Sequence, residues 1–154
     1  MTSLVFVCLG NICRSPMAER VARRVAAERG LELEISSYAL STEEAGNPID
    51  PRAAAVLQAA GYETGGHRAR QISAADVDSA DLVVAVEPYQ VERLRRMSPG
   101  ADHIRLLNDF NPAMPPGTPL EDPWYGDSAG FHATLADVEA AIPGILDEVL
   151  AAAR

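Results

Sequence analysis

Residues 8–15 near the start of the chain, CLGNICRS, combine a thiol, a guanidinium and a hydroxyl within one short segment. They follow the apolar run 4–7, which predicts a buried strand, and they precede a helical pattern. Ser15 suits the N-cap of that helix, Pro16 suits its first position, and Glu19 places negative charge in its first turn. Backbone N–H groups and the helix dipole at such a junction favour an anion. The segment therefore predicts an anion site that also holds a nucleophile.

Each residue type in this segment fits a step of phosphoryl transfer through sulfur. Cys8 attacks phosphorus as a thiolate, which a helix N-terminus and an adjacent arginine stabilise. Gly10 removes side-chain bulk and permits positive φ, while Asn11 tolerates left-handed geometry and can tie the loop internally. Arg14 can bind two phosphoryl oxygens at once, and the hydroxyl of Ser15 can donate to the sulfur as it leaves. The same site is expected to include the remaining members of the segment, Leu9, Ile12 and Cys13.

Phosphoryl transfer from an aryl phosphate also needs an acid, because the departing phenol oxygen has to receive a proton. The stretch DPWYGD offers such an acid. Asp122 is the candidate acid, held in an extended conformation by the proline that follows it. Trp124 and Tyr125 offer flat walls for an aromatic leaving group. Taken alone, the stretch also fits a solvated turn with two packing aromatics. Asp127 is a lesser candidate for the acid.

The composition indicates one globular domain that spans residues 1–154, with 47% hydrophobic and 23% charged residues. No apolar run approaches the ~18 residues of a membrane span, and no signal peptide precedes Cys8, so we expect a cytoplasmic protein without membrane contact. Its two cysteines make no disulfide framework. No set of cysteines and histidines has metal-ligand spacing, so we expect no metal and no other cofactor.

The charge pattern excludes several other classes of protein. A net charge of −9 argues against nucleic acid as a partner and requires local positive potential for any anionic substrate. All 13 basic residues are arginine, which excludes a Schiff-base lysine and a Walker-type phosphate loop.

The apolar pattern alternates between short strands and amphipathic helices. This alternation predicts an α/β fold with a doubly wound, four-stranded parallel sheet and helices on both faces. In such folds the functional site lies at the carboxyl ends of the strands, which is where residues 8–15 fall. The long loop 108–121 would return the Asp122 stretch to that edge, and Pro143 should kink or restart the last helix. The strands are expected near residues 4–7, 31–37, 82–86 and 104–107. The helices are expected near 16–29, 52–60, 88–97 and 131–149, with a further short helix capped by residues 73–76.

The segment CLGNICRSP resembles the phosphate loop of bacterial low-molecular-weight protein tyrosine phosphatases. The stretches GNPIDPR and HRARQ and the Asp-Pro-aromatic-Tyr motif at Asp122 are also similar to that family, so the resemblance covers nearly the whole chain. It implies that Cys8, Arg14 and Asp122 hydrolyse phosphotyrosine in proteins through a phosphocysteine, with phosphate or vanadate as inhibitors. It also implies that Ser37 braces Asn11. His67 would lie behind the loop, although a surface turn histidine fits its sequence context equally well.

Four positions depart from the family's usual pattern. Leu40 lacks a hydroxyl, and Glu87 stands where aspartate is usual and could pair with His67. Trp124 replaces a tyrosine, and Glu43 lies in the loop that flanks the family's pocket. These departures concern substrate selectivity more than the reaction.

Two other functions fit parts of the same pattern. An arsenate reductase uses this fold and loop but passes oxidation to further cysteines, and this chain has none after Cys13. A catalytically silent phosphotyrosine-binding module would need neither Cys8 nor Asp122. We therefore expect the phosphatase.

Overall fold

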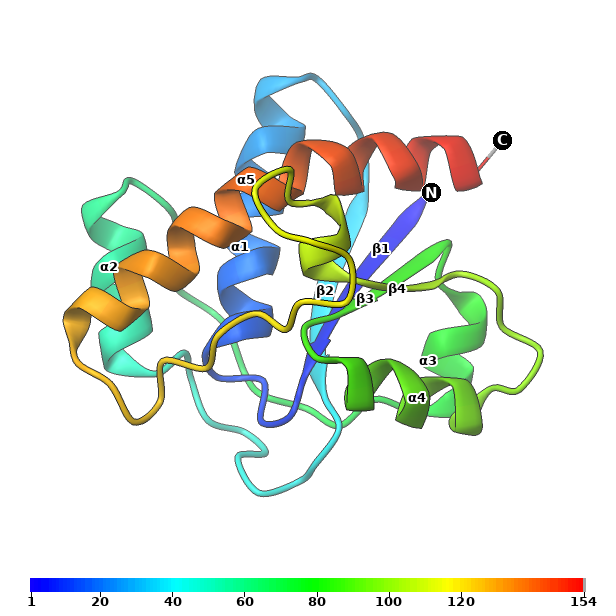
Figure 1. Cartoon of the computed structure of the whole chain (residues 1–154), viewed down its shortest axis with the longest axis horizontal. Coiled ribbons are helices and arrows are strands. Elements are labelled where there is room, and N and C mark those ends of the chain that lie inside the picture. The colour runs from blue at the N-terminus through cyan, green and yellow to red at the C-terminus, as the bar shows by residue number, and fades with distance from the viewer. Residues whose placement is uncertain (154) are drawn as a thin grey trace.

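The structure is a computed structural model that describes residues 1–153. Its centre is a four-stranded parallel sheet in the order β2-β1-β3-β4, with helices on both faces (Figure 1), which confirms the predicted doubly wound α/β class. The elements in chain order are β1 (Ser3–Cys8), α1 (Arg14–Glu28), β2 (Glu34–Ala39), α2 (Pro51–Ala59), α3 (Ala74–Ser79), β3 (Leu82–Ala85), α4 (Pro88–Met97), β4 (Ile104–Leu106), the 3-10 helix η1 (Leu107–Phe110) and α5 (Ser128–Ala152).

Alternate side chains of the strands enter two separate cores because successive residues of a strand point to opposite faces. Leu4, Phe6 and Cys8 of β1 pack in the larger core, with apolar residues of α1, α2 and α5. Val5 and Val7 pack in the smaller core, with residues of α3 and α4. A strand buried on both faces needs a nearly continuous apolar sequence, as β1 and β3 have.

The strand order puts β1 between β2 and β3, so the residues that follow Cys8 emerge near the middle of the sheet's carboxyl edge. Cys8 pairs in register with Ala39, the last residue of β2, and Val7 pairs with Ala85, the last residue of β3. Loops from three neighbouring strands therefore meet around residues 8–15. This edge is where sequence reasoning expects the site.

The start of α1 differs from the sequence prediction. The helix begins at Arg14 and is preceded by Cys13, so Ser15 is not the N-cap and Pro16 is not the first helical residue. Ser15 cannot serve as a cap because its hydroxyl contacts Cys8 and Asn11. Glu19 lies beyond the first turn and instead forms ion pairs with arginines of its own helix.

Other boundaries also differ from expectation. β2 begins at Glu34 rather than near residue 31, because its register pairs Ser3 with Glu34. The predicted loop after β4 contains the 3-10 helix η1. α5 continues through Pro143 as one helix, although its axis bends in Figure 1. Packing of the α5 apolar face in the larger core explains why a proline, which removes one backbone hydrogen bond, does not end the helix.

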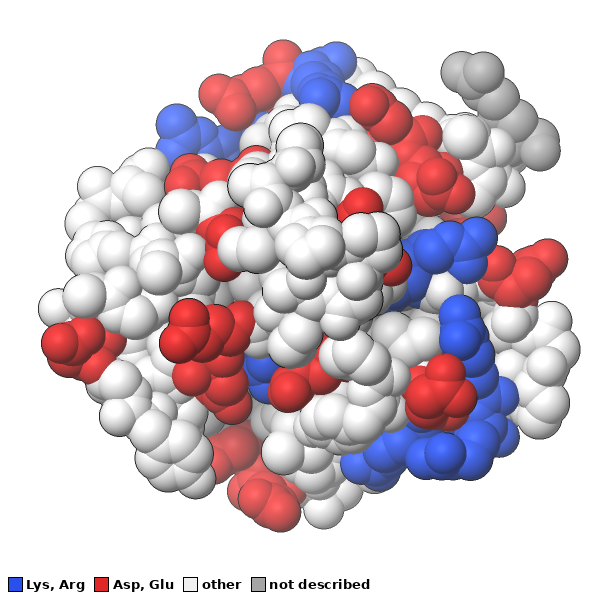
Figure 2. All heavy atoms as spheres, in the orientation of Figure 1, with Lys and Arg blue, Asp and Glu red and all other residues white. Residues whose placement is uncertain are grey.

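Charged side chains are distributed over the surface in Figure 2, and the basic ones visible there gather mainly at the lower right, over the region that holds α4 in Figure 1. The sequence of α4 includes Arg93, Arg95 and Arg96. Within residues 1–153, none of the helices combines the length and the apolar composition needed to cross a membrane.

The burial of α5 leads to a prediction about stability. Leu146 is fully buried in the larger core, whereas Leu150, one turn further along α5, is partly exposed. Leu146→Ala should lower the free energy of unfolding by about 2–5 kcal/mol, because it removes buried methyl groups and leaves a cavity. Leu150→Ala makes the same chemical change and should cost clearly less. Equal losses in denaturant unfolding of the two variants would contradict the packing of α5.

Candidate active site

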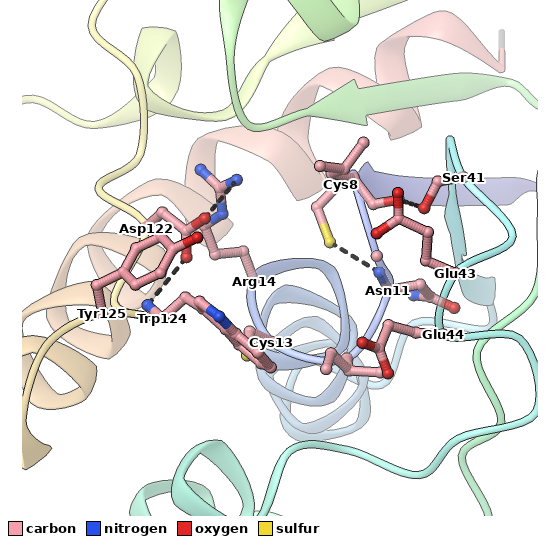
Figure 3. A pocket seen from close by; sticks show the side chains of 13 residues that line it. Cys8, Asn11, Cys13, Arg14, Ser41, Glu43, Glu44, Asp122, Trp124 and Tyr125 are labelled. Carbon is pink, nitrogen blue, oxygen red and sulfur yellow. Dashed lines mark hydrogen bonds and ion pairs between the residues drawn. The ribbon is translucent and has the colours of Figure 1, made fainter.

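A pocket of about 230 Å³ opens where β1 ends. Its floor is formed by the Cys8 loop, by which we mean residues 8–15, and all members except Ser15 line the pocket. Figure 3 shows two opposing walls, with Asp122, Trp124 and Tyr125 on one side and the loop after β2 on the other. That second wall consists of Ser41, Glu43 and Glu44, which places the acidic loop beside the pocket as the sequence suggested.

The sulfur of Cys8 lies deep in this pocket, with only 4% of the residue exposed. The backbone N–H of Asn11 donates a hydrogen bond to Sγ at 3.2 Å, drawn in Figure 3. The Ser15 hydroxyl oxygen lies 3.0 Å from the same sulfur, on the buried side of the loop. A hydroxyl and an amide that both point at the sulfur provide donors for a thiolate.

Asn11 holds the loop in this shape. It has φ of 60°, whereas Gly10 does not have the positive φ that its sequence permits. A Cβ at Gly10 would lie 3.4 Å from Cγ of Glu44, which is an ordinary contact with a flexible side chain, so neither space nor backbone geometry requires glycine there. The Asn11 amide nitrogen donates to the Ser15 hydroxyl at 2.7 Å and to the Ser37 hydroxyl at 2.9 Å.

Ser37 and His67 support Asn11 from behind the pocket, and neither lines it. The Ser37 hydroxyl donates a hydrogen bond to the Glu19 carboxylate at 2.6 Å, while Nε2 of His67 lies 2.7 Å from the Asn11 carbonyl oxygen. Burial lowers the pKa of His67 below its ordinary value, against the opposite effect of this hydrogen bond. His67 is therefore neutral at neutral pH and can donate Nε2–H to that carbonyl.

The guanidinium of Arg14 contacts three oxygen acceptors. One Nη donates to the Leu120 carbonyl at 2.8 Å, and the other lies 2.8 Å from the Glu87 carboxylate and 3.5 Å from that of Asp122. The suggestion that Glu87 pairs with His67 is therefore wrong. Glu87 pairs with Arg14 because it precedes α4 at the carboxyl end of β3, beside the Cys8 loop.

The two acidic candidates of the stretch DPWYGD have different environments. Asp122 lines the pocket, is about half exposed, and accepts a hydrogen bond from the Trp124 N–H at 3.0 Å. Asp127 instead caps α5, where its carboxylate accepts from the backbone N–H groups of Ala129 and Gly130. Tyr125 is 96% exposed and forms the rim rather than a packed wall. The geometry therefore favours Asp122 over Asp127 as the acid.

The two cysteines are chemically distinct although both are buried. Burial raises the pKa of the Cys13 thiol far above its ordinary value, and the negative charges of Asp50, Cys8 and Asp122 act in the same direction. Cys13 is therefore protonated at neutral pH and lacks the thiolate form that attacks phosphorus. Among residues 1–153, no group of three or more histidine, cysteine or acidic side chains could hold a metal ion.

Arg52 is a site residue to which sequence reasoning assigned no role. Its guanidinium donates to both carboxylate oxygens of Asp50 at 3.1 Å and to the Trp124 carbonyl at 2.9 Å. It also lies over the rings of Trp124 and Phe131, 5.1 and 4.9 Å from their centroids. Asp50 in turn donates its N–H to the Ile12 carbonyl, so Arg52 connects the Cys8 loop to the Asp122 wall.

The hydrogen bonds between Arg52 and Asp50 favour the ionised form of the Asp50 carboxyl. Although burial opposes ionisation, the hydrogen bonds from the Arg52 side chain and backbone N–H lower the pKa of the Asp50 carboxyl. The sequence signal for this pair is Asp50-Pro51 as a helix cap and first turn, which the structure bears out for α2. The stacking on Trp124 involves a residue 72 positions away and has no local signal.

A parallel α/β sheet with a thiol and an arginine at the two ends of a helix-opening loop is the arrangement of a cysteine-dependent phosphatase. The family model described as "Low molecular weight phosphotyrosine protein phosphatase" matches residues 3–154. The chain belongs to the low-molecular-weight phosphotyrosine protein phosphatase family.

Curated relatives and solved structures agree with this assignment. Low molecular weight protein-tyrosine phosphatase A of Mycobacterium tuberculosis is 40% identical over 151 residues, which cover 95% of this chain and 90% of that protein. The Streptomyces coelicolor low molecular weight protein-tyrosine-phosphatase is 41% identical over 94% of this chain and 91% of its own. The structure of YfkJ from Bacillus subtilis matches with a TM-score of 0.90 and 31% identity, covering 100% of this chain and 98% of that one.

The contacts of Arg52 predict a change in the fluorescence of Trp124, the single tryptophan of the chain. Arg52→Ala should shift the emission to the red and raise quenching by acrylamide, because the ring loses its stacked guanidinium and the segment loses an anchor. Arg24→Ala is the matched control, since it removes an arginine that lies over Tyr62 instead. Unchanged emission and quenching in Arg52→Ala would contradict the connection.

Proposed function

We propose that this protein hydrolyses phosphotyrosine in protein substrates through a phosphocysteine on Cys8. The observation that carries the proposal is the convergence of the Cys8 sulfur, the Arg14 guanidinium and the Asp122 carboxylate on one small pocket. A nucleophile, an oxyanion clamp and an acid are the three groups that such a displacement needs.

The first step forms a bond between the Cys8 sulfur and phosphorus while the bond between phosphorus and the phenol oxygen breaks. Asp122 gives its proton to that oxygen, so the leaving group departs as a neutral phenol. Arg14 and the N–H groups of the Cys8 loop bind the equatorial oxygens, where negative charge is concentrated. The phosphoryl group would take the place beside Arg14 where the Asp122 carboxylate lies, 3.5 Å from the guanidinium.

The second step returns the enzyme to its starting state. A water molecule attacks phosphorus, its proton goes to the Asp122 carboxylate, and the bond between sulfur and phosphorus breaks. The departing sulfur is stabilised by the Ser15 hydroxyl at 3.0 Å and the Asn11 N–H at 3.2 Å. Inorganic phosphate is the product, so phosphate and vanadate should compete with the substrate for the same loop.

The names of the relatives and the pocket walls support an aryl phosphate as the substrate. The Mycobacterium tuberculosis and Streptomyces coelicolor relatives are both named protein-tyrosine phosphatases. Trp124 and Tyr125 lie beside the acid, where a phenyl ring would leave. The net charge of −9 argues against nucleic acid as the partner.

The identity of the nucleophile can be tested with a pair of cysteine variants. Cys8→Ser should abolish hydrolysis of a chromogenic aryl phosphate and leave the fold intact, because a serine hydroxyl is not ionised at this position. Cys13→Ser is the matched control and should keep most of the activity, since the Cys13 thiol is already protonated. Turnover that survives in Cys8→Ser would exclude the covalent mechanism, and a complete lack of turnover in the wild type would favour a binding module.

The acid can be tested with two isosteric variants. Asp122→Asn should slow hydrolysis of phosphotyrosine by about 10²–10⁴-fold, the usual contribution of positioned proton transfer. It should slow an aryl phosphate with a very acidic phenol far less, because that leaving group needs no proton. Asp127→Asn keeps the cap of α5 and should have neither effect.

The dependence on the leaving group separates the two roles of Asp122. A uniform loss of rate across phenols of different acidity would mean that Asp122 only shapes its segment. A loss that depends on the leaving group in Asp127→Asn, but not in Asp122→Asn, would move the acid to Asp127.

A further inference from the structure

A second hollow lies behind the Cys8 loop and is lined by residues of α1, of β2 and of the segment that runs from α2 to α3. Figure 1 shows where these elements lie. Its volume is about 680 Å³, and it shares no lining residue with the pocket at Cys8. We call it the arginine hollow, because its lining includes four arginines: Arg20, Arg23, Arg68 and Arg70.

The charge of the arginine hollow is opposite to that of the chain. Its four arginines face a single lining carboxylate, Glu19, which leaves an excess of three positive charges on a protein with a net charge of −9. His67 adds no charge at neutral pH, because burial lowers its pKa. A concave surface of one sign of charge concentrates ions of the other sign.

Two of the four arginines already have partners within the protein. Arg23 forms an ion pair with the Glu19 carboxylate at 2.9 Å and donates hydrogen bonds to the Ile35 carbonyl. Arg20 donates through Nη1 to the Gly65 carbonyl. These two arginines therefore form the wall of the hollow rather than its free donors.

The remaining donors have no acceptor within the described part of the chain. Arg68 and Arg70 are exposed, and neither guanidinium forms a hydrogen bond or an ion pair with any residue of 1–153. The Nε of Arg20 is also without an acceptor although Arg20 is only 7% exposed, because its 3.3 Å approach to Glu19 lacks hydrogen-bonding geometry. A buried donor without an acceptor is costly and therefore unusual in a folded protein.

We propose that the arginine hollow binds a small anion with several phosphate groups. Planar guanidinium forks match phosphate oxygens two at a time. The Arg68 guanidinium has no partner in residues 1–153, and that of Arg70 contacts the face of the Tyr38 ring but donates no hydrogen bond. The hollow is about three times as large as the pocket at Cys8, and its volume is in the range of small-molecule sites, so a single phosphate would leave much of it empty. The ligand class is a polyphosphate or a phosphorylated metabolite with adjacent phosphates.

Binding can be measured with inorganic triphosphate as the probe and amide NMR shifts as the readout, because the two sites have different reporters. Gly65, Gly66 and Ala69 report the arginine hollow, while Gly10 and Ile12 report the pocket at Cys8. Triphosphate should cause saturable shifts at the first set, with a Kd at least about tenfold lower than that of orthophosphate at the same residues. Absence of saturable shifts there, or equal affinity for the two anions, would overturn the proposal.

Two double variants separate a built site from general attraction by charge. Arg68→Ala with Arg70→Ala should weaken triphosphate binding in the arginine hollow at least about tenfold. Arg93→Ala with Arg96→Ala removes the same charge from the exposed face of α4 and should change that Kd less than twofold. Because Arg70 also lies over the ring of Tyr38, Arg68→Ala alone is the variant that leaves this packing intact, and it should weaken binding as well. Equal weakening in both double variants, or unchanged binding in Arg68→Ala, would overturn the proposal.

Discussion

The hydrogen bonds of Asn11 are the constraint on which the rest of the site depends. A residue with φ of 60° turns its backbone N–H toward the Cys8 sulfur, a conformation that asparagine tolerates better than most side chains. Four groups hold it there: the hydroxyls of Ser15 and Ser37, the His67 ring and the Arg70 backbone N–H. The donors around the sulfur are therefore oriented before any phosphate arrives, which is the condition for electrostatic stabilisation without reorganisation.

The pocket at Cys8 is lined by one positive side chain, Arg14, and by several carboxylates. Arg14 contacts both Glu87 and Asp122, and Glu43 and Glu44 line the opposite side of the pocket. On a chain with this much negative charge, Arg14 and the N–H groups of the loop supply the positive potential that the proposed phosphorylated substrate needs. Glu87 orients the guanidinium, while Asp122 is the partner that an incoming phosphoryl group can replace. The glutamates at the rim place negative charge beside whatever residues flank the substrate's phosphate.

The parts of this structure that follow local rules could be predicted from the sequence. Period-two and period-3.6 patterns locate the strands and helices, and the position of Cys8 after a strand puts it at the carboxyl edge of a parallel sheet. Capping rules predict the wrong start for α1 because the Ser15 hydroxyl contacts the Cys8 sulfur instead of the helix backbone. The partner of Glu87 was misjudged because both His67 and Arg14 lie near the edge, and only side-chain geometry chooses between them. The role of Arg52 cannot be predicted from local patterns, because its guanidinium stacks on Trp124, which lies far along the chain.

The depth of the sulfur also has a consequence for which phosphorylated side chains can react. Cys8 is only 4% exposed, at the floor of a pocket whose rim carries Trp124 and the nearly fully exposed Tyr125. In phosphotyrosine the whole length of an aromatic ring separates phosphorus from the main chain, whereas in phosphoserine the spacer is a single methylene. The shorter side chain would have to bring its own peptide backbone down between the walls to reach the thiol. Under the proposed function, the height of the walls would therefore select the longer side chain before any bond is formed or broken.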